Sequence, residues 1–413
     1  MLLKIIAIFI LTVFLSSCTS PVNQNAEGNF KNSGTIFDIL TGLNSSETEM
    51  RGMWISFLDL KEPLKKENKE EFSDEIEKIY DNCISMGINT VFVHVRPYGD
   101  SIYPSEFFNM SSFCNPNAEY DALKIMTKKA KEKKLSFHAW INPMRTVATE
   151  EIKDISKEYP IRQWYDDSLL KARNLFEYEG RVYLNPASDE VRNLITDGVK
   201  EILKKYDVDG IHIDDYFYPP LLPASYDEAY YNDYLANGGD KSLKAWRQEN
   251  TTKMVKELYD TVKGKSKKLI FSISPTGNTY YNEHNIYADI KTWCTEHGYC
   301  DYIIPQLYYG FENEVLDYIT ALNEWNEFVN HDNVNLVIGL AAYKVGAEDK
   351  NSGSGINEWK VNDDVLSRQV KALKEYENVN GVVFFRYDSL FYEANPAKKY
   401  IESEIERISA LFD

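Results

Sequence analysis

The sequence predicts an α/β fold, a single (β/α)8 or TIM barrel with long loops after its third and fourth strands. Eight short apolar runs, rich in β-branched and aromatic residues, recur between residues 51 and 386. Helix-length amphipathic stretches separate these runs, and this alternation indicates parallel strands joined by helical crossovers. The length of 413 residues also fits one barrel with insertions. A doubly wound parallel sheet is the structural alternative.

The predicted strands have the length and composition of β-strands. They cover residues 51–57, 89–95, 135–141, 210–214, 269–274, 302–307, 335–340 and 381–386. Between the strands, apolar residues spaced three and four positions apart predict helices. The clearest patterns are Ile76, Ile79, Tyr80, Cys83 and Ile84, then Val191, Leu194, Ile195, Val199 and Ile202, then Val315, Tyr318, Ile319, Leu322 and Trp325.

Two of the predicted connections are long, residues 142–188 after the third strand and residues 215–240 after the fourth. Both follow the carboxyl end of a strand, where barrel enzymes build their sites. The second connection is dense in Tyr and Pro. We expect it to form a wall of a substrate site, with a simple surface elaboration as the alternative.

The N-terminal residues predict export. Residues 1–17 combine one lysine with an apolar run too short to span a bilayer comfortably, followed by Leu15-Ser16-Ser17-Cys18. This ending resembles the lipobox of bacterial lipoproteins, which implies cleavage before Cys18 and lipidation of that residue; an ordinary secretory signal is the alternative. Residues 18–48 then predict a flexible tether, and residues 49–413 the barrel. The protein is expected on the cell surface or periplasmic side, anchored to a membrane.

The composition narrows the function classes. The chain has 46 Lys and Arg against 64 Asp and Glu, a net charge of −18, so it lacks the basic footprint of a nucleic-acid binder. Its 29 tyrosines favour sugar or peptide ligands. No cysteine or histidine spacing indicates a zinc site, and we expect no cofactor. The cysteines after the tether could be free or paired, and Cys294 and Cys300 are the closest two.

Strand alternation identifies the side chains that point into the barrel. In the fourth strand, Ile211 and Ile213 should face the helices, which turns His212 and Asp214 inward, with Asp214 at the rim. The same parity applied to the other strands predicts inward residues near the mouth. These are His94, Arg96, His138, Trp140, Asn142, Gln306, Tyr308, Arg386 and Asp388. Burying polar groups at so many strand ends costs free energy unless they are hydrogen-bonded or bind a ligand, so they predict a substrate site at the barrel mouth.

Three inward histidines also raise the alternative of a metal site. His94, His138 and His212 lie two or four residues below the rim. We therefore interpret them as a buried hydrogen-bonded layer that supports Arg96 and Asp214.

The same residues carry a family resemblance. The motifs RGMWIS, NTVFVHVRPYGDSIYPSE, HAWINPMR, YLNPASDEVR and DGIHIDDYFYP resemble the glycosyl-hydrolase-like family 10 of bacterial exported lipoproteins, over roughly residues 50–386. The resemblance implies a barrel that acts on glycosidic bonds, with bacterial cell-wall glycan as the substrate class. DGIHIDDY is also similar to a chitinase-like strand motif, but His212 and Tyr216 replace its second Asp and its Glu. The proton donor of that family is therefore missing.

Glycoside hydrolysis normally needs two carboxyl groups. Asp214 is the first candidate, and Asp215 the second, because it could raise the pKa of its neighbour. Asp388 is the candidate on the eighth strand, while Asp100, Glu106 and Glu283 remain open. An N-acetyl group on the substrate could also act as the nucleophile.

The remaining candidates are assigned to glycan binding. Arg96 and Asn142 would bind hydroxyl groups or orient Asp214, and Trp140 and Tyr308 would form platforms for sugar faces. His212, Tyr216, Gln306 and Arg386 complete the set. A non-catalytic glycan-binding scaffold is the competing function, and a metal-dependent deacetylase or amidase is the third. The sequence leaves the oligomeric state open.

Overall fold

The computed structural model describes residues 49–412. The predicted signal peptide, the lipidation site at Cys18 and the tether of residues 18–48 lie outside the described residues, so they stay predictions. No helix among the described residues is long and apolar enough to cross a membrane.

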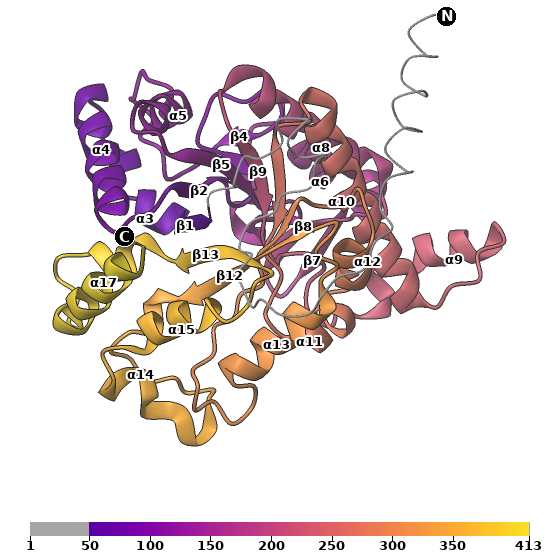
Figure 1. Ribbon diagram of the computed structural model, residues 1–413. Coiled ribbons are helices and arrows are strands. Elements are labelled where there is room, and N and C mark those ends of the chain that lie inside the picture. Colours follow the sequence, from indigo (N-terminus) through magenta and orange to yellow (C-terminus); the bar gives the residue numbers. More distant parts are fainter. Residues whose placement is uncertain (1–48, 413) are drawn as a thin grey trace, which may run out of the picture. The chain divides into compact units, whose positions relative to one another are not determined.

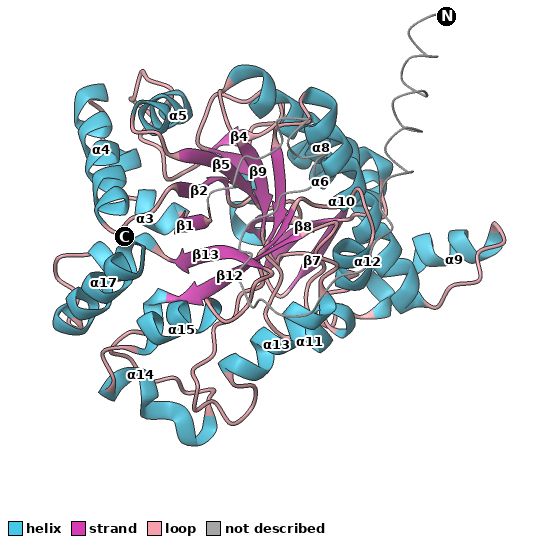
Figure 2. Cartoon of the chain, in the orientation of Figure 1, coloured by secondary structure: helices cyan, strands magenta, loops and turns pink. Residues whose placement is uncertain are grey.

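Eight parallel strands close into one barrel, and they follow one another around it in chain order (Figures 1 and 2). The strands are β1 (Met50–Ile55), β2 (Thr90–Arg96), β5 (Ser136–Ile141), β9 (Gly210–Ile213), β10 (Ile270–Ile273), β11 (Tyr302–Ile303), β12 (Asn335–Ala341) and β13 (Val379–Phe385). The predicted (β/α)8 barrel is confirmed, and the doubly wound sheet is excluded. The sixth strand is shorter than predicted, since Pro305 has no amide proton for a ladder.

Helices form the outer layer of the barrel (Figure 2). They are α3 (Phe57–Leu60), α4 (Lys69–Ser85), α5 (Ala122–Glu132), α6 (Pro160–Asp166), α7 (Ser168–Asn174), α8 (Asp189–Lys205), α9 (Glu228–Ala236), α10 (Leu243–Lys265), α11 (Thr279–His284), α12 (Ile290–Thr295), α13 (Tyr318–Phe328), α14 (Glu358–Val361), α15 (Val365–Leu373), α16 (Tyr387–Phe391) and α17 (Lys398–Phe412).

The three helical patterns correspond to α4, α8 and α13. Their periodic residues are buried against the strands, as an amphipathic helix requires. Two residues differ from the prediction: Ile84 is exposed at the end of α4, and Val315 lies before α13 and is exposed.

The hydrophobic core has two parts, as in other closed barrels. A large cluster lies between strands and helices, and a smaller one fills the barrel interior. The interior cluster contains Trp54, Phe92, Trp140, Val337 and Val383. The mouth is thus built on a packed aromatic floor.

The two long connections carry their own secondary structure. Residues 142–188 contain a three-stranded antiparallel sheet, in the order β6 (Arg145–Ala148), β8 (Arg181–Leu184) and β7 (Leu175–Tyr178). Residues 215–240 contain α9, which projects from the barrel at the right of Figure 1 and has no buried residue. A two-stranded sheet of β3 (Asp100–Ser101) and β4 (Asn109–Met110) follows β2.

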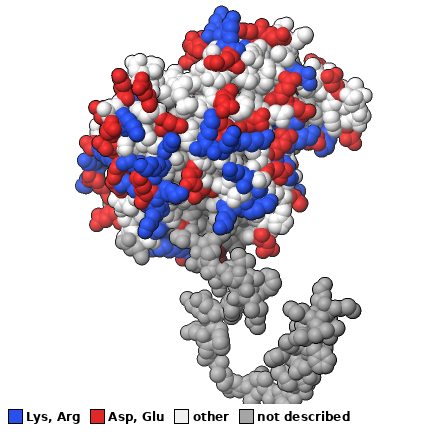
Figure 3. All heavy atoms as spheres, turned by 90° about the horizontal axis from the view of Figure 1, so that it is seen from above, with Lys and Arg blue, Asp and Glu red and all other residues white. Residues whose placement is uncertain are grey.

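The four described cysteines, Cys83, Cys114, Cys294 and Cys300, are free, which settles the disulfide question for this part of the chain. On the surface, acidic and basic side chains are interspersed over the face seen in Figure 3.

Candidate active site

A cavity of about 320 Å³ opens at the carboxyl ends of the barrel strands. It receives side chains from most of the strands and from the loops that follow them. Its lining consists of Trp54, Ser56, Phe57, Leu58, His94, Tyr98, Trp140, Arg145, Asp214, Asp215, Tyr216, Ser274, Gln306, Tyr308 and Phe385. The structure therefore brings together six of the predicted site residues, Trp140, Asp214, Asp215, Tyr216, Gln306 and Tyr308, and His94 of the inward layer also lines the cavity.

Asp214 follows the last residue of β9 and is 3% exposed. The indole Nε1 of Trp140 donates a hydrogen bond of 3.0 Å to its Oδ2, and Nδ2 of Asn142 lies 3.3 Å from both carboxylate oxygens. The backbone amide of Tyr216 donates to Oδ1 at 3.3 Å. The predicted role of Asn142 in orienting Asp214 agrees with this geometry, although Asn142 itself lies behind the cavity wall.

Burial raises the pKa of Asp214 to about 7, and repulsion from Asp215 adds to this effect, whereas Arg145 and the hydrogen-bond donors oppose it. Burial also raises the pKa of Asp215, and a hydrogen bond from the Gln306 side chain opposes that shift. Two neighbouring carboxyls in one buried site do not both ionise readily. Because its pKa is raised to about 7, Asp214 is the carboxyl of the pair that can hold a proton near neutral pH.

Aromatic rings form most of the remaining surface. The Trp140 indole stacks on the His94 ring, with centroids 3.7 Å apart and planes 10° apart. Tyr308 stacks on Phe385 with centroids 5.8 Å apart. Trp54 of β1 contributes both to the cavity and to the interior cluster. Such flat apolar surfaces suit the faces of sugar rings.

Arg145 is the principal site residue that the strand pattern missed. It begins β6, in the loop after β5, where strand parity gives no direction. Arg145 is part of the HAWINPMR motif, but strand alternation does not predict the direction of its side chain. The guanidinium lies over the ring of Tyr216, 3.5 Å from its centroid, and beside the cavity. Phe57, Tyr98 and Ser274 were also missed. The observed strands β1, β2 and β10 end before these residues, although the predicted strands included Phe57 and Ser274.

The prediction that Arg96 points into the mouth is wrong. The pairing of β2 with β5 shifts register between His94 and Arg96, so one extra residue of β2 reverses the side-chain direction. The Arg96 guanidinium lies 4.1 Å from the centroid of Phe108 and is 1% exposed. It also occupies the space where a Cβ at Gly198 of α8 would lie. Arg96 therefore belongs to the layer between strands and helices.

The predicted mouth positions of Arg386 and Asp388 are also wrong. β13 ends at Phe385, and the chain turns there into α16, so strand alternation no longer applies. Arg386 pairs with the buried carboxylate of Asp59, and Asp388 lies 3.2 Å from Arg386. Neither residue lines the cavity. These three residues close the barrel rim between its first and last strands.

The three inward histidines form a layer beneath the mouth, but only one of them is hydrogen-bonded. His212 accepts from Nε1 of Trp54 at 3.1 Å, and its other nitrogen lies 2.8 Å from Oγ of Ser272. His212 thus supports the floor and does not line the cavity. His138 packs on Phe92 and, like His94, has no hydrogen-bond partner for its ring nitrogens in the described structure. No group of three His, Cys, Asp or Glu among residues 49–412 is arranged to hold a metal ion.

The other carboxyl candidates do not reach the cavity. Asp100 is buried and accepts the amide of Tyr98 at 2.8 Å, while Glu106 is exposed beside Lys205. Glu283, in α11, is outside the lining as well. Among the described residues, Asp214 and Asp215 are the carboxyls that line the cavity.

The tyrosine-rich loop after β9 is mostly structural. Phe217 packs on Trp293 at 5.1 Å and Tyr218 on Tyr287 at 5.5 Å, both inside the body of the protein. Tyr231 contacts Trp246 of α10. Beyond Asp215, Tyr216 is the residue of this loop that lines the cavity, so the predicted wall is reduced to one side chain.

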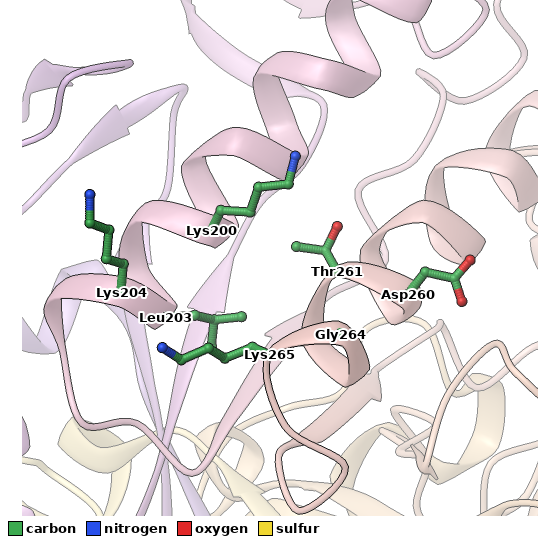
Figure 4. Close-up of a pocket in the computed structure, with 7 residues that line it drawn as sticks. All are labelled: Lys200, Leu203, Lys204, Asp260, Thr261, Gly264 and Lys265. Atoms are coloured by element: carbon green, nitrogen blue, oxygen red, sulfur yellow. The ribbon is translucent and has the colours of Figure 1, made fainter.

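A second hollow, of about 490 Å³, lies between α8 and α10 (Figure 4). Lysines from both helices surround it, with Asp260 and Thr261 on α10. The carboxyl ends of these helices lead into β9 and β10, so this groove lies toward the opposite end of the barrel from the acidic pair. It contains no pair of carboxyls and no aromatic surface.

Comparison with known proteins identifies relatives along most of the chain. The family model described as Glycosyl hydrolase-like 10 matches residues 49–354. Glycosyl hydrolase YngK of Bacillus subtilis (strain 168) is 31% identical over 353 residues, which are 80% of this chain and 67% of YngK. Glycosyl hydrolase DigH of Escherichia coli (strain K12) is 29% identical over 381 residues, or 84% of each chain.

Solved structures share the fold at low sequence identity. The glycoside hydrolase domain of PgaB (BpsB) from Bordetella bronchiseptica superimposes with a TM-score of 0.56 at 10% identity, covering 86% of this chain and 98% of that domain. Alpha-L-fucosidase isoenzyme 2 from Paenibacillus thiaminolyticus gives a TM-score of 0.52 at 10% identity, covering 88% of this chain and 49% of the fucosidase. At these identities the likeness extends to the barrel fold.

Proposed function

Because this chain belongs to the Glycosyl hydrolase-like 10 family, and with it to the glycoside hydrolases, we propose that it cleaves glycosidic bonds of bacterial cell-wall glycan in the cavity around Asp214 and Asp215. One observation carries this proposal: two adjacent carboxyls, whose pKa values are both raised, line an aromatic cavity at the strand ends.

The two carboxyls take different roles because their surroundings differ. Asp214 is the more deeply buried and keeps its proton near pH 7, so it serves as the general acid on the leaving oxygen. We assign the ionised role to Asp215, because a hydrogen bond from the Gln306 side chain opposes the rise of its pKa that burial causes. Pairs of carboxyls whose pKa values are driven apart in this way are typical of glycosidases.

The arrangement favours a nucleophile supplied by the substrate. Asp214 and Asp215 come from one strand end, whereas two-carboxylate mechanisms place their groups on opposite sides of the scissile bond. A 2-acetamido group fills the missing role. Its carbonyl oxygen attacks C1, the glycosidic C–O bond breaks, and the Asp214 proton moves to the leaving oxygen. Asp215 accepts a hydrogen bond from the acetamido N–H.

A second step restores the catalyst. Water adds to C1 and opens the cyclic intermediate, and Asp214 takes up the proton that the water releases. Both displacements occur at C1, so the product keeps the configuration of the substrate. The stacked pairs Trp140–His94 and Tyr308–Phe385 supply flat surfaces for the sugar rings during both steps.

The cellular location follows from the N-terminal sequence. Cleavage before Cys18 and lipidation of Cys18 would anchor the barrel to a membrane through residues 18–48, on the side where cell-wall glycan lies.

The test is product analysis with residues 49–413, which form one compact unit. The substrates are peptidoglycan, peptide-free glycan strands, chitin oligomers and starch. We expect new reducing ends from N-acetylated glycans and none from starch, with activity unaffected by a chelator. Binding without new reducing ends would instead identify a scaffold. Acetate release without chain cleavage, sensitive to chelators, would identify a deacetylase.

A further inference from the structure

Arg145 places a fixed positive charge at the wall of the acidic cavity. Its backbone amide donates to Oδ1 of Asn142 at 3.0 Å, which ties the start of β6 to the residue that orients Asp214. Its guanidinium carbon lies 3.5 Å from the ring centroid of Tyr216 and 4.7 Å from that of Tyr98. Stacking on these rings fixes the plane of the fork while leaving its edge available.

The guanidinium has no acidic partner of its own. Within residues 49–412, no Asp or Glu oxygen lies within 4.0 Å of Arg145, and its Nε is buried without a hydrogen-bond partner. Arg247, which is buried, pairs with Asp227 at 2.6 Å, and Arg192 pairs with Glu257 at 3.0 Å. Arg145 is half-buried and interacts with Asp214, Asp215 and the Tyr216 hydroxyl, but it forms no direct ion pair, so its guanidinium remains open to an acidic group of a ligand.

The neighbouring cavity wall also contains polar atoms without hydrogen-bond partners. The ring nitrogens of His94 and the hydroxyl of Ser274 line the same cavity, are buried, and have no hydrogen-bond partner in the described structure. Burial lowers the pKa of His94 well below its usual value, so this ring is neutral. Among the described lining residues, Arg145 is the only Arg or Lys.

The chemistry of the missing partner follows from this environment. A guanidinium fork matches a planar carboxylate or a phosphate through two parallel hydrogen bonds. The neighbouring Asp215 carboxyl would, when ionised, repel a dianion more strongly than a singly charged carboxylate. We propose that Arg145 is a specificity-determining residue that binds a carboxylate carried by the sugar in this cavity. This inference rests on the proposed glycosidase function and narrows its substrate to acidic glycans.

The first test changes the substrate and leaves the protein intact. Peptide-free peptidoglycan strands carry a carboxylate on every second sugar, and coupling with methylamine converts these groups to neutral amides. We expect kcat/KM for release of reducing ends to fall about 10- to 100-fold on the amidated strands, as for the loss of a hydrogen bond to a charged group. Equal rates on the two preparations would overturn the inference.

The second test changes the residue. Arg145→Gln should raise KM on the acidic strands by a similar factor, so that kcat/KM no longer differs between acidic and amidated strands; Arg145→Lys should keep part of the difference because the point charge remains. Arg181→Gln is the matched control: the Arg181 guanidinium carbon also lies near the Tyr98 ring, 5.0 Å from its centroid, and Arg181 donates to the Thr146 carbonyl at 2.6 Å, outside the cavity lining. A loss of rate that is equal on both strand types would show that Arg145 acts on the carboxyl pair instead.

The two proposals fail in different ways. If glycosidase function is wrong, the unmodified protein releases no reducing ends from either strand preparation. If only the carboxylate inference is wrong, both preparations are cleaved at the same rate. Thermal unfolding of each variant, compared with the unmodified protein, separates loss of recognition from loss of fold.

Discussion

The indole Nε1 of Trp140 donates a 3.0 Å hydrogen bond to Oδ2 of Asp214, which joins the third barrel strand to the acid at the end of the fourth. Trp140 is itself held by face-to-face stacking on His94. Trp140 and His94 both lie on barrel strands, so the barrel itself supplies one of the donors that orient the Asp214 carboxyl, beside Asn142 and the Tyr216 amide of the loops.

We expect Trp140→Phe to reduce kcat/KM about 10-fold while leaving the fold intact, because phenylalanine keeps the stacking surface and removes one donor. The lost hydrogen bond favoured the ionised form of Asp214, so its pKa should rise. The alkaline limb of the pH–rate profile should therefore move to higher pH. A profile that is weaker but unshifted would mean that the indole N–H does not act through Asp214.

The acidic pair should also make stability depend on pH. Burial raises the pKa of Asp214 from 3.8 to about 7, so between these values the folded state binds more protons than the unfolded state. The free energy of unfolding should then fall as pH rises through this window, and the penalty is fully present above pH 7. Asp214→Asn removes the penalty and should stabilise the protein by up to a few kcal/mol at pH 8 and little at pH 4. Denaturant titrations at the two pH values measure the difference, and equal effects would contradict the assignment.

The rim cluster of Asp59, Arg386 and Asp388 gives a stability prediction. Arg386→Met would leave the fully buried Asp59 carboxylate without its cation, which should cost about 3 kcal/mol at pH 8. The pKa of Asp59 is raised to about 6, mainly by burial, and Arg386 opposes the shift. Loss of Arg386 should therefore matter less at pH 5, where Asp59 is protonated.

The double variant Asp59→Asn/Arg386→Met provides the control, since it removes both charges. It should recover most of the stability at pH 8. If the double variant is as unstable as Arg386→Met alone, packing and not charge explains the loss.

A substitution at Arg96 tests whether its side chain points away from the barrel interior, as the structure shows. Its guanidinium lies outside the barrel against Phe108, and its nitrogens have no hydrogen-bond partner in the described structure. Replacing a buried ionic group with an apolar side chain of similar length is often neutral or stabilising. We expect Arg96→Met to keep kcat and KM and to leave the melting temperature unchanged or higher. A large rise in KM would place Arg96 in the site after all.

The strand pattern predicted much of this architecture and part of the site. Trp140 was found because it lies on a regular strand, where alternation fixes direction, and Asp214 because it directly follows one. Arg96 was misplaced because a register shift after His94 leaves no mark in the residue pattern. Asp388 was misplaced because alternation was extended past the end of β13. Arg145 was missed because its direction depends on stacking with Tyr216, a contact between two loops that no periodicity describes.

The central claim is that Asp214 and Asp215, and not the rim carboxyls, perform hydrolysis. The direct measurement is the initial rate of reducing-end release from peptide-free peptidoglycan strands by Asp214→Asn, Asp215→Asn and Asp388→Asn, with thermal unfolding to verify the fold of each. We expect the first two substitutions to lower kcat/KM about 10²–10⁴-fold, as for loss of a general acid or base. Asp388→Asn should retain most of the activity, because Asp388 lies outside the cavity. Full activity of Asp214→Asn, or loss of activity in Asp388→Asn alone, would contradict the account.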